Sequence, residues 1–196
     1  METDVQTIPE SLIYEMTDQG PIYYRGYEAY LNGTKTLEEI MGSSILQSFI
    51  VTRLSHFITA ALIAKNKYVP LSSELGIQLA RGKHRAADIA IVRRDQMKKV
   101  KDKRKYLGFA PEVVIEVDIK AELKAVDGMA DSLGYVNEKT EELFRFGVKK
   151  VIWILTDTEK VVVAEARQPW AFIDWDQDIA VLDNCRVNVR AIVDEI

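Results

Sequence analysis

The sequence predicts a mixed α/β domain with a central sheet between helices. One long segment has the three- and four-residue apolar spacing of an amphipathic helix, several short segments have the β-branched composition of strands, and a second helical segment precedes two further strands. This order is typical of a central sheet and does not repeat as regular βαβ units. A chain of 196 residues, of which 47% are hydrophobic and 29% charged, is long enough for one such domain and its core.

The first part of the chain carries two signals for helix starts. Residues 1–35 contain many turn formers and tyrosines, and we expect them to form an N-terminal extension packed on a domain that spans residues 36–196. Thr36-x-x-Glu39 and Ser44-x-x-Gln47 both match the capping box, in which side chains satisfy free backbone N–H groups. After the second box, the apolar spacing predicts a helix of about five turns that ends near Lys65.

The later elements are shorter. Gly147 stands where a helix C-cap often falls, at the end of a second helix predicted from about residue 131 to 146. The residues after Pro169 are expected to add strands at the sheet edge or against a partner chain. The other strands are predicted at 76–80, 87–92, 112–119, 151–155 and 160–166.

The composition excludes several kinds of protein. The single cysteine, Cys185, leaves no internal disulfide framework and no cysteine zinc cluster, and two histidines leave little room for a histidine-rich metal site. No run approaches the roughly 18 consecutive apolar residues of a membrane helix. The acidic N-terminus, Met1-Glu2-Thr3-Asp4, lacks the basic and apolar segments of a signal peptide. We therefore expect a protein of the reducing cytoplasm without a membrane segment.

The net charge of −4 is unevenly distributed along the chain. Residues 93–105 carry +6, so the remainder carries −10. Taken alone, such a run is usually a solvated loop, although a local basic segment also attracts phosphate. Because this segment joins the two strands that carry the acids described next, we expect it to contact a nucleic-acid backbone beside them. Its basic residues are Arg93, Arg94, Lys98, Lys99, Lys101, Lys103, Arg104 and Lys105.

Acidic residues interrupt two strands that are otherwise apolar. In the strand 112–119, alternation places Glu116, Asp118 and Lys120 on one side. The preceding strand holds Asp88 between Ala87 and Ile89. Ionised groups in such strands are costly unless they are paired or bind a metal. If the two strands pair, the carboxylates of Asp88 and Glu116, with Asp118 near them, form a site of hard oxygen ligands that suits Mg²⁺ or Mn²⁺.

A lysine near these acids has two candidates. Lys120 follows them on the same strand, whereas Lys139 lies on the second helix. Val136, Lys139 and Leu143 recur at helical spacing, which places Lys139 on or beside the face that packs on the sheet. The alternatives from the residues alone are a structural ion pair between Lys139 and Glu116, or solvent exposure at the strand end.

These segments resemble a known family. The matching stretches are Arg85 to Val92, Pro111 to Val117, and Lys139 to Ile154, which includes Gly147-Val148 and Trp153. Their order resembles the PD-(D/E)XK nuclease superfamily and, more closely, the Uma-two family of restriction-type endonucleases, over about residues 36–166. Ala87 stands where the family usually has proline, and Asp118 where it is commonly apolar. Asp118-Ile119-Lys120 also spells the superfamily's D-x-K in a second register.

The resemblance implies a fold and an activity. The fold would be a restriction-endonuclease-like core, and the activity Mg²⁺- or Mn²⁺-dependent cleavage of phosphodiester bonds, with DNA as the expected substrate. Asp88 and Glu116 match the family's metal carboxylates. Lys139 matches the family's lysine, which lies on the helix in this family and on the strand in the wider superfamily. A homodimer is plausible because cutting both strands requires two sites. The alternatives are a non-catalytic nucleic-acid-binding or regulatory protein with this fold, and a protein-interaction module.

Overall fold

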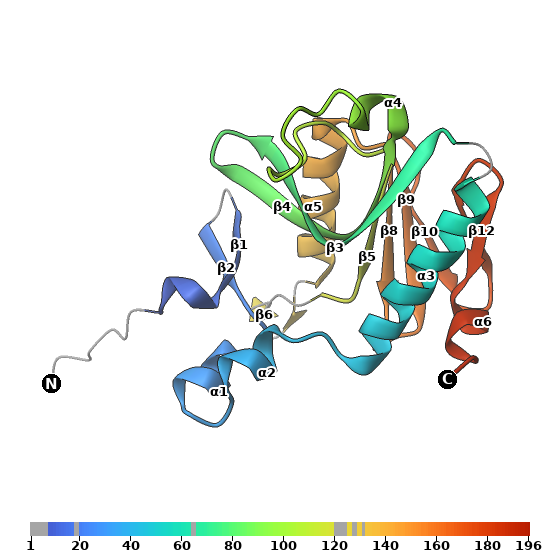
Figure 1. The fold of residues 1–196 in the computed structure, drawn as a ribbon. Coiled ribbons are helices and arrows are strands. Elements are labelled where there is room, and N and C mark those ends of the chain that lie inside the picture. Colours follow the sequence, from blue (N-terminus) through green and yellow to red (C-terminus); the bar gives the residue numbers. More distant parts are fainter. Residues whose placement is uncertain (1–7, 18–19, 64–65, 120–124, 127–128, 131) are drawn as a thin grey trace, which may run out of the picture. The chain divides into compact units, whose positions relative to one another are not determined.

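The computed structural model describes residues 8–17, 20–63, 66–119, 125–126, 129–130 and 132–196. The chain forms two compact units (Figure 1). One contains residues 1–42 and 120–135, and the other contains residues 43–119 and 136–196.

The smaller unit consists of short elements around a few apolar side chains. Leu12, Tyr27 and Ile40 form its buried cluster. The predicted capping box at Thr36 is confirmed, because its Oγ1 accepts from the Glu39 N–H at 3.3 Å and its N–H donates to the Glu39 carboxylate at 2.6 Å. The elements are η1 (Glu10–Leu12), β1 (Ile13–Thr17), β2 (Gly20–Tyr23), α1 (Tyr27–Leu31), α2 (Leu37–Met41), β6 (Ala125–Val126) and β7 (Met129–Ala130).

The division between the units differs from the predicted boundary after residue 35. The helix α2 belongs to the smaller unit because Ile40 completes its apolar cluster. The second segment of this unit, residues 120–135, comes from between β5 and the body of α5, a long-range association that apolar spacing along the chain does not reveal.

A six-stranded mixed sheet forms the centre of the larger unit, as predicted. Its strand order is β10-β9-β8-β5-β4-β3. Only β5 and β8 are parallel, and α5 (Ser132–Phe146) connects them along the chain. The strands are β3 (Tyr68–Ala80), β4 (Lys83–Arg93), β5 (Val113–Val117), β8 (Lys150–Leu155), β9 (Lys160–Glu165) and β10 (Ala171–Asp174).

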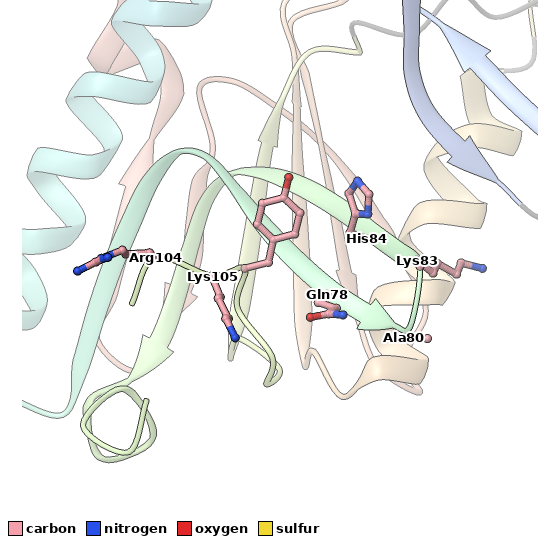
Figure 2. A pocket seen from close by; sticks show the side chains of 8 residues that line it. Gln78, Ala80, Lys83, His84, Arg104 and Lys105 are labelled. Atoms are coloured by element: carbon pink, nitrogen blue, oxygen red, sulfur yellow. The ribbon is translucent and has the colours of Figure 1, made fainter. Parts of the chain in front are cut away.

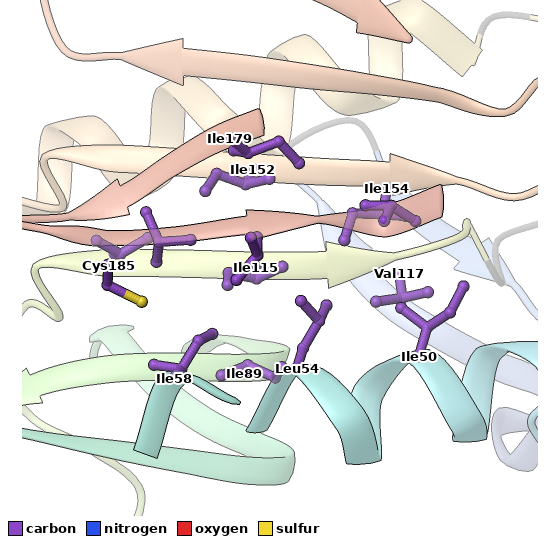
Figure 3. Packing of buried hydrophobic residues seen from close by; sticks show 14 of the residues in the cluster. Ile50, Leu54, Ile58, Ile89, Ile115, Val117, Ile152, Ile154, Ile179 and Cys185 are labelled. Atoms are coloured by element: carbon purple, nitrogen blue, oxygen red, sulfur yellow. The ribbon is translucent and has the colours of Figure 1, made fainter. Parts of the chain in front are cut away.

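The helix α3 (Ile45–Ile63) packs on one face of this sheet through a stripe of apolar side chains. Ile50, Leu54 and Ile58 meet Ile89 and Ile115 in the main core (Figure 3). Of the described helices, α3 alone has the length and hydropathy of a membrane span. Ile50, Leu54, Ile58 and Leu62 of this helix are buried in the core of the larger unit. β11 (Asp178–Leu182), β12 (Cys185–Asn188) and α6 (Val189–Val193) contribute to the same core.

The helix α5 covers the other face. Because successive strand residues point to opposite sides, Trp153 of β8 faces away from the α3 core that receives Ile152 and Ile154. The Trp153 Nε1–H donates to Thr140 Oγ1 of α5 at 3.0 Å. The helix ends before Gly147, whose φ of +114° is accessible to glycine and strained for other residues.

After Pro169 the chain adds strands in two places. β10 extends the sheet at its edge, as predicted, whereas β11 and β12 form a separate two-stranded sheet. The predicted strand 76–80 is the end of a much longer β3, which pairs with β4 along its length. A bulge interrupts this pairing at Ser73 and Glu74, whose φ angles are 75° and 51°.

Candidate active site

A buried ion pair joins α5 to the middle of the sheet. Lys139 Nζ lies 3.2 Å from Glu116 Oε1, and the two residues are 1% and 4% exposed. The same ammonium group lies 5.5 Å from the centre of the Trp153 ring, within cation–π range. The helical spacing of Val136, Lys139 and Leu143 therefore correctly placed this lysine on the sheet-facing side of its helix.

Asp88 lies on the strand next to Glu116. β4 and β5 are antiparallel, with Ile89 opposite Ile115, so one further step of this register places Asp88 opposite Glu116. Residues opposite each other in an antiparallel pair project to the same side. Asp88 Oδ2 accepts a hydrogen bond from the Val117 N–H at 2.8 Å. The structure thus brings the two predicted carboxylates to neighbouring positions.

Gln47 also contacts the backbone of Val117. Its Nε2 donates to the Val117 carbonyl at 2.7 Å, and the residue is 4% exposed. The sequence assigned Gln47 to a capping box, but only its backbone N–H serves that motif, donating to Ser44 Oγ at 3.0 Å. A signal was present, because Gln47, Ile50 and Leu54 share the buried stripe of α3.

A polar hollow of about 350 Å³ lies beside Asp88. The bulge of β3 contributes Ser73 and Glu74 to its wall, and the first half of α3 contributes Gln47. Left-handed backbone at two consecutive non-glycine residues is costly, and such strain gathers at functional sites. The lining residues are Ser43, Gln47, Ser48, Val51, Thr52, Ser55, Ser72, Ser73, Glu74 and Asp88.

The sequence predicted that Asp118 shares the strand face of Glu116, and the structure shows that it does not. β5 ends at Val117, and Asp118 has a φ of +64°, so strand alternation stops there. Its carboxylate accepts from the Thr156 N–H at 2.7 Å and from Thr156 Oγ1 at 2.8 Å. Asp118 therefore joins the ends of two parallel strands. Lys120, the other candidate lysine, lies outside the described residues.

A second buried ion pair, which was not predicted from the sequence, joins Arg85 and Glu142. Arg85 Nε donates to Glu142 Oε2 at 2.7 Å, and the two residues are 1% and 4% exposed. Lys83 Nζ lies 2.7 Å from the other oxygen of Glu142, and Glu138 lies 3.5 Å from Arg85. Glu138 and Glu142 are one helical turn apart, which was a usable signal for a shared cation.

The basic segment is divided among several environments. Arg93 ends β4, and its guanidinium pairs with Asp95 at 2.9 Å and holds the pKa of that carboxyl at about 2. Arg94 begins the short helix α4 (Arg94–Met97), and Lys98 to Lys105 are exposed apart from Val100. The segment begins about 16 Å along β4 from Asp88, at roughly 3.3 Å per residue. It therefore starts away from the acids, and just after its end Leu107 bonds to Gly76 and Gln78 of β3, which pair with Ala86 and His84 of β4. The predicted contact with a nucleic-acid backbone stays a prediction.

The donors at Asp88 and Glu116 fit a hard divalent cation. Within the described ranges, no three or more histidine, cysteine, aspartate or glutamate side chains form a ready metal site. Mg²⁺ commonly uses only one or two carboxylates, with water and substrate phosphate completing its shell. Two carboxylates at opposite positions of adjacent strands meet that requirement.

Comparison with known proteins supports the fold. No family model and no curated protein matches the sequence. A solved structure from Anabaena variabilis, described as "a putative nuclease belonging to DUF820", matches with a TM-score of 0.59. The two sequences are 14% identical, and the match covers 78% of this chain and 82% of that one. The predicted α+β architecture, a central mixed sheet flanked by helices, is therefore confirmed, and this chain shares the fold of that protein.

Proposed function

We propose that this protein is a metal-dependent nuclease that hydrolyses phosphodiester bonds, with DNA as its substrate. The observation that carries the proposal is the buried Lys139–Glu116 pair beside Asp88. Buried charges are costly, and groups of buried ionisable residues are typical of catalytic sites. Of the proposed metal ligands, Asp88 also lines the polar hollow. The shared fold and the sequence resemblance to PD-(D/E)XK nucleases also support it.

Each residue has a distinct role in the proposal. Asp88 and Glu116 would hold Mg²⁺, which, when bound, lowers the pKa of a coordinated water and stabilises charge on the phosphate. Lys139 supplies a fixed positive charge beside Glu116 that favours the added negative charge of the transition state. Asp88 accepts from the Val117 N–H and Gln47 donates to the Val117 carbonyl, so both contacts hold the backbone directly after Glu116.

Calorimetry and cleavage together test the proposal. The protein should bind MnCl₂ and cut plasmid DNA in its presence, and Asp88→Asn and Glu116→Gln should lose both properties while remaining folded. Glu165→Gln is the matched control. Glu165 is an exposed acid at the end of β9 that pairs with Lys150 of β8, and it is not one of the proposed metal ligands. Cleavage that persists in Asp88→Asn and Glu116→Gln would overturn the assignment.

A non-catalytic nucleic-acid-binding protein is the second candidate. The observation that favours it is that Asp88 already accepts from Val117 and Glu116 already pairs with Lys139. Binding of DNA without metal-dependent cleavage by the intact protein would support this alternative.

A further inference from the structure

A second hollow, of about 370 Å³, lies beside the β3–β4 hairpin. Figure 2 shows Arg104 and Lys105 on the segment that crosses this hairpin, and His84 and Lys83 at the start of β4. The Lys83 ammonium group forms an ion pair with the Glu142 carboxylate, with 2.7 Å between Nζ and Oε1. The lining residues are Gln78, Ala80, Gly82, Lys83, His84, Arg104, Lys105 and Tyr106.

The segment that carries Arg104 and Lys105 is firmly attached to β3. The Leu107 N–H donates to the Gly76 carbonyl at 2.8 Å, and the Gln78 N–H donates to the Leu107 carbonyl at 2.9 Å. The Leu107 side chain is buried, and Leu107 forms a parallel β-bridge with Ile77. These contacts fix the end of an otherwise exposed basic segment at a definite place on the hairpin.

Tyr106 lies against Gly76 because glycine has no side chain. A Cβ at Gly76 would lie 2.5 Å from Tyr106 Cδ1, closer than atoms of this kind approach. The tyrosine is nevertheless 57% exposed, and its ring centre lies 5.3 Å from that of His84. The hairpin therefore holds an aromatic ring at the surface, beside a second ring, in a fixed position.

We propose that this hollow binds single-stranded nucleic acid. A base stacks on the Tyr106 ring, and Arg104 and Lys105 contact the flanking phosphates. A fixed, exposed aromatic beside two exposed cations favours a single strand, because the bases of a duplex are already stacked on one another. The inference rests on the proposed nucleic-acid function and adds a binding surface that neither Asp88 nor Glu116 lines.

Fluorescence anisotropy with a labelled 20-nucleotide single strand in EDTA tests the binding surface without cleavage. Tyr106→Ala should weaken binding by about five- to hundredfold while the salt dependence is unchanged, and Tyr106→Phe should bind normally. Arg104→Ala and Lys105→Ala should each reduce the slope of log K against log salt by about 0.7. Gly76→Ala displaces the ring without changing charge, and should match Tyr106→Ala with a normal circular dichroism spectrum.

Two results would overturn the inference. One is normal single-strand binding by Tyr106→Ala, and the other is an equal loss of affinity for a 20-base-pair duplex in that variant. The proposed cleavage is tested separately by Glu116→Gln, which should cut nothing and still bind the single strand. Tyr106-dependent binding without cleavage by the unaltered protein would refute the nuclease and leave the binding surface standing.

Discussion

Removing Lys139 separates a structural ion pair from a catalytic one. In Lys139→Met, the Glu116 carboxylate stays at a position that is 4% exposed and loses its cation at 3.2 Å. Breaking such a pair costs about 3–5 kcal/mol, which for a chain of this length lowers Tm by about 6–20 °C. Removing both charges in Glu116→Gln/Lys139→Met should restore most of this stability, because no buried charge is left alone.

Thermal melting by circular dichroism and plasmid cleavage measure the two effects on the same proteins. We expect the double variant to melt near the unaltered protein and to cleave about 10²–10⁴-fold more slowly. Arg85→Met/Glu142→Leu is a matched control, since it removes an equally buried pair between α5 and the sheet. It should retain cleavage. Cleavage by a stable Glu116→Gln/Lys139→Met protein would refute the catalytic role.

Three further outcomes follow from single contacts. Gly147→Ala should cost about 1–3 kcal/mol in urea unfolding, because φ is +114° and a new Cβ would lie 3.2 Å from Ala110 Cβ; unchanged stability would contradict that backbone. Arg93 holds the Asp95 pKa below its usual value, so this pair stabilises the fold above about pH 4 and no longer does so once the pH falls through 2. An NMR titration of the Asp95 carboxyl with a midpoint near pH 4 would show that the ion pair is absent. Burial raises the pKa of the Cys185 thiol, so a thiol reagent at neutral pH should react only after unfolding, and fast labelling would contradict its burial.

Much of the fold could be predicted because its elements have strong periodicity. The apolar stripe that includes Leu54 and Ile58 predicted the end of α3 to within two residues. The bounds predicted for the second helix agree with those of α5 to within one residue. The bulge at Ser73 and Glu74 could not be predicted, because neither residue is a glycine that would indicate left-handed backbone. The joining of residues 120–135 to the first 42 residues depends on long-range contacts that no local pattern encodes.

The site was predicted where regular geometry holds. Lys139 lies well inside α5, so helical spacing gave its direction correctly, whereas Asp118 lies one residue beyond β5, where strand alternation no longer applies. Gln47 was misinterpreted because a helix start offers two roles to one residue, and its backbone took the cap while its side chain reached Val117.

The two buried ion pairs together constrain how α5 lies on the sheet. Lys139 pairs with Glu116 of β5, and Glu142, three residues later on the same helix, pairs with Arg85 of β4. Contacts to two adjacent strands restrict both rotation of the helix about its axis and sliding along it. Apolar residues could cover the sheet with less desolvation of charge, whereas each of these ion pairs forms in only one register of the helix on the sheet. A site that needs an ammonium group within about 3 Å of a carboxylate requires that register. Of the two pairs, Lys139–Glu116 contains the carboxylate opposite Asp88, so its loss is the one that should stop cleavage.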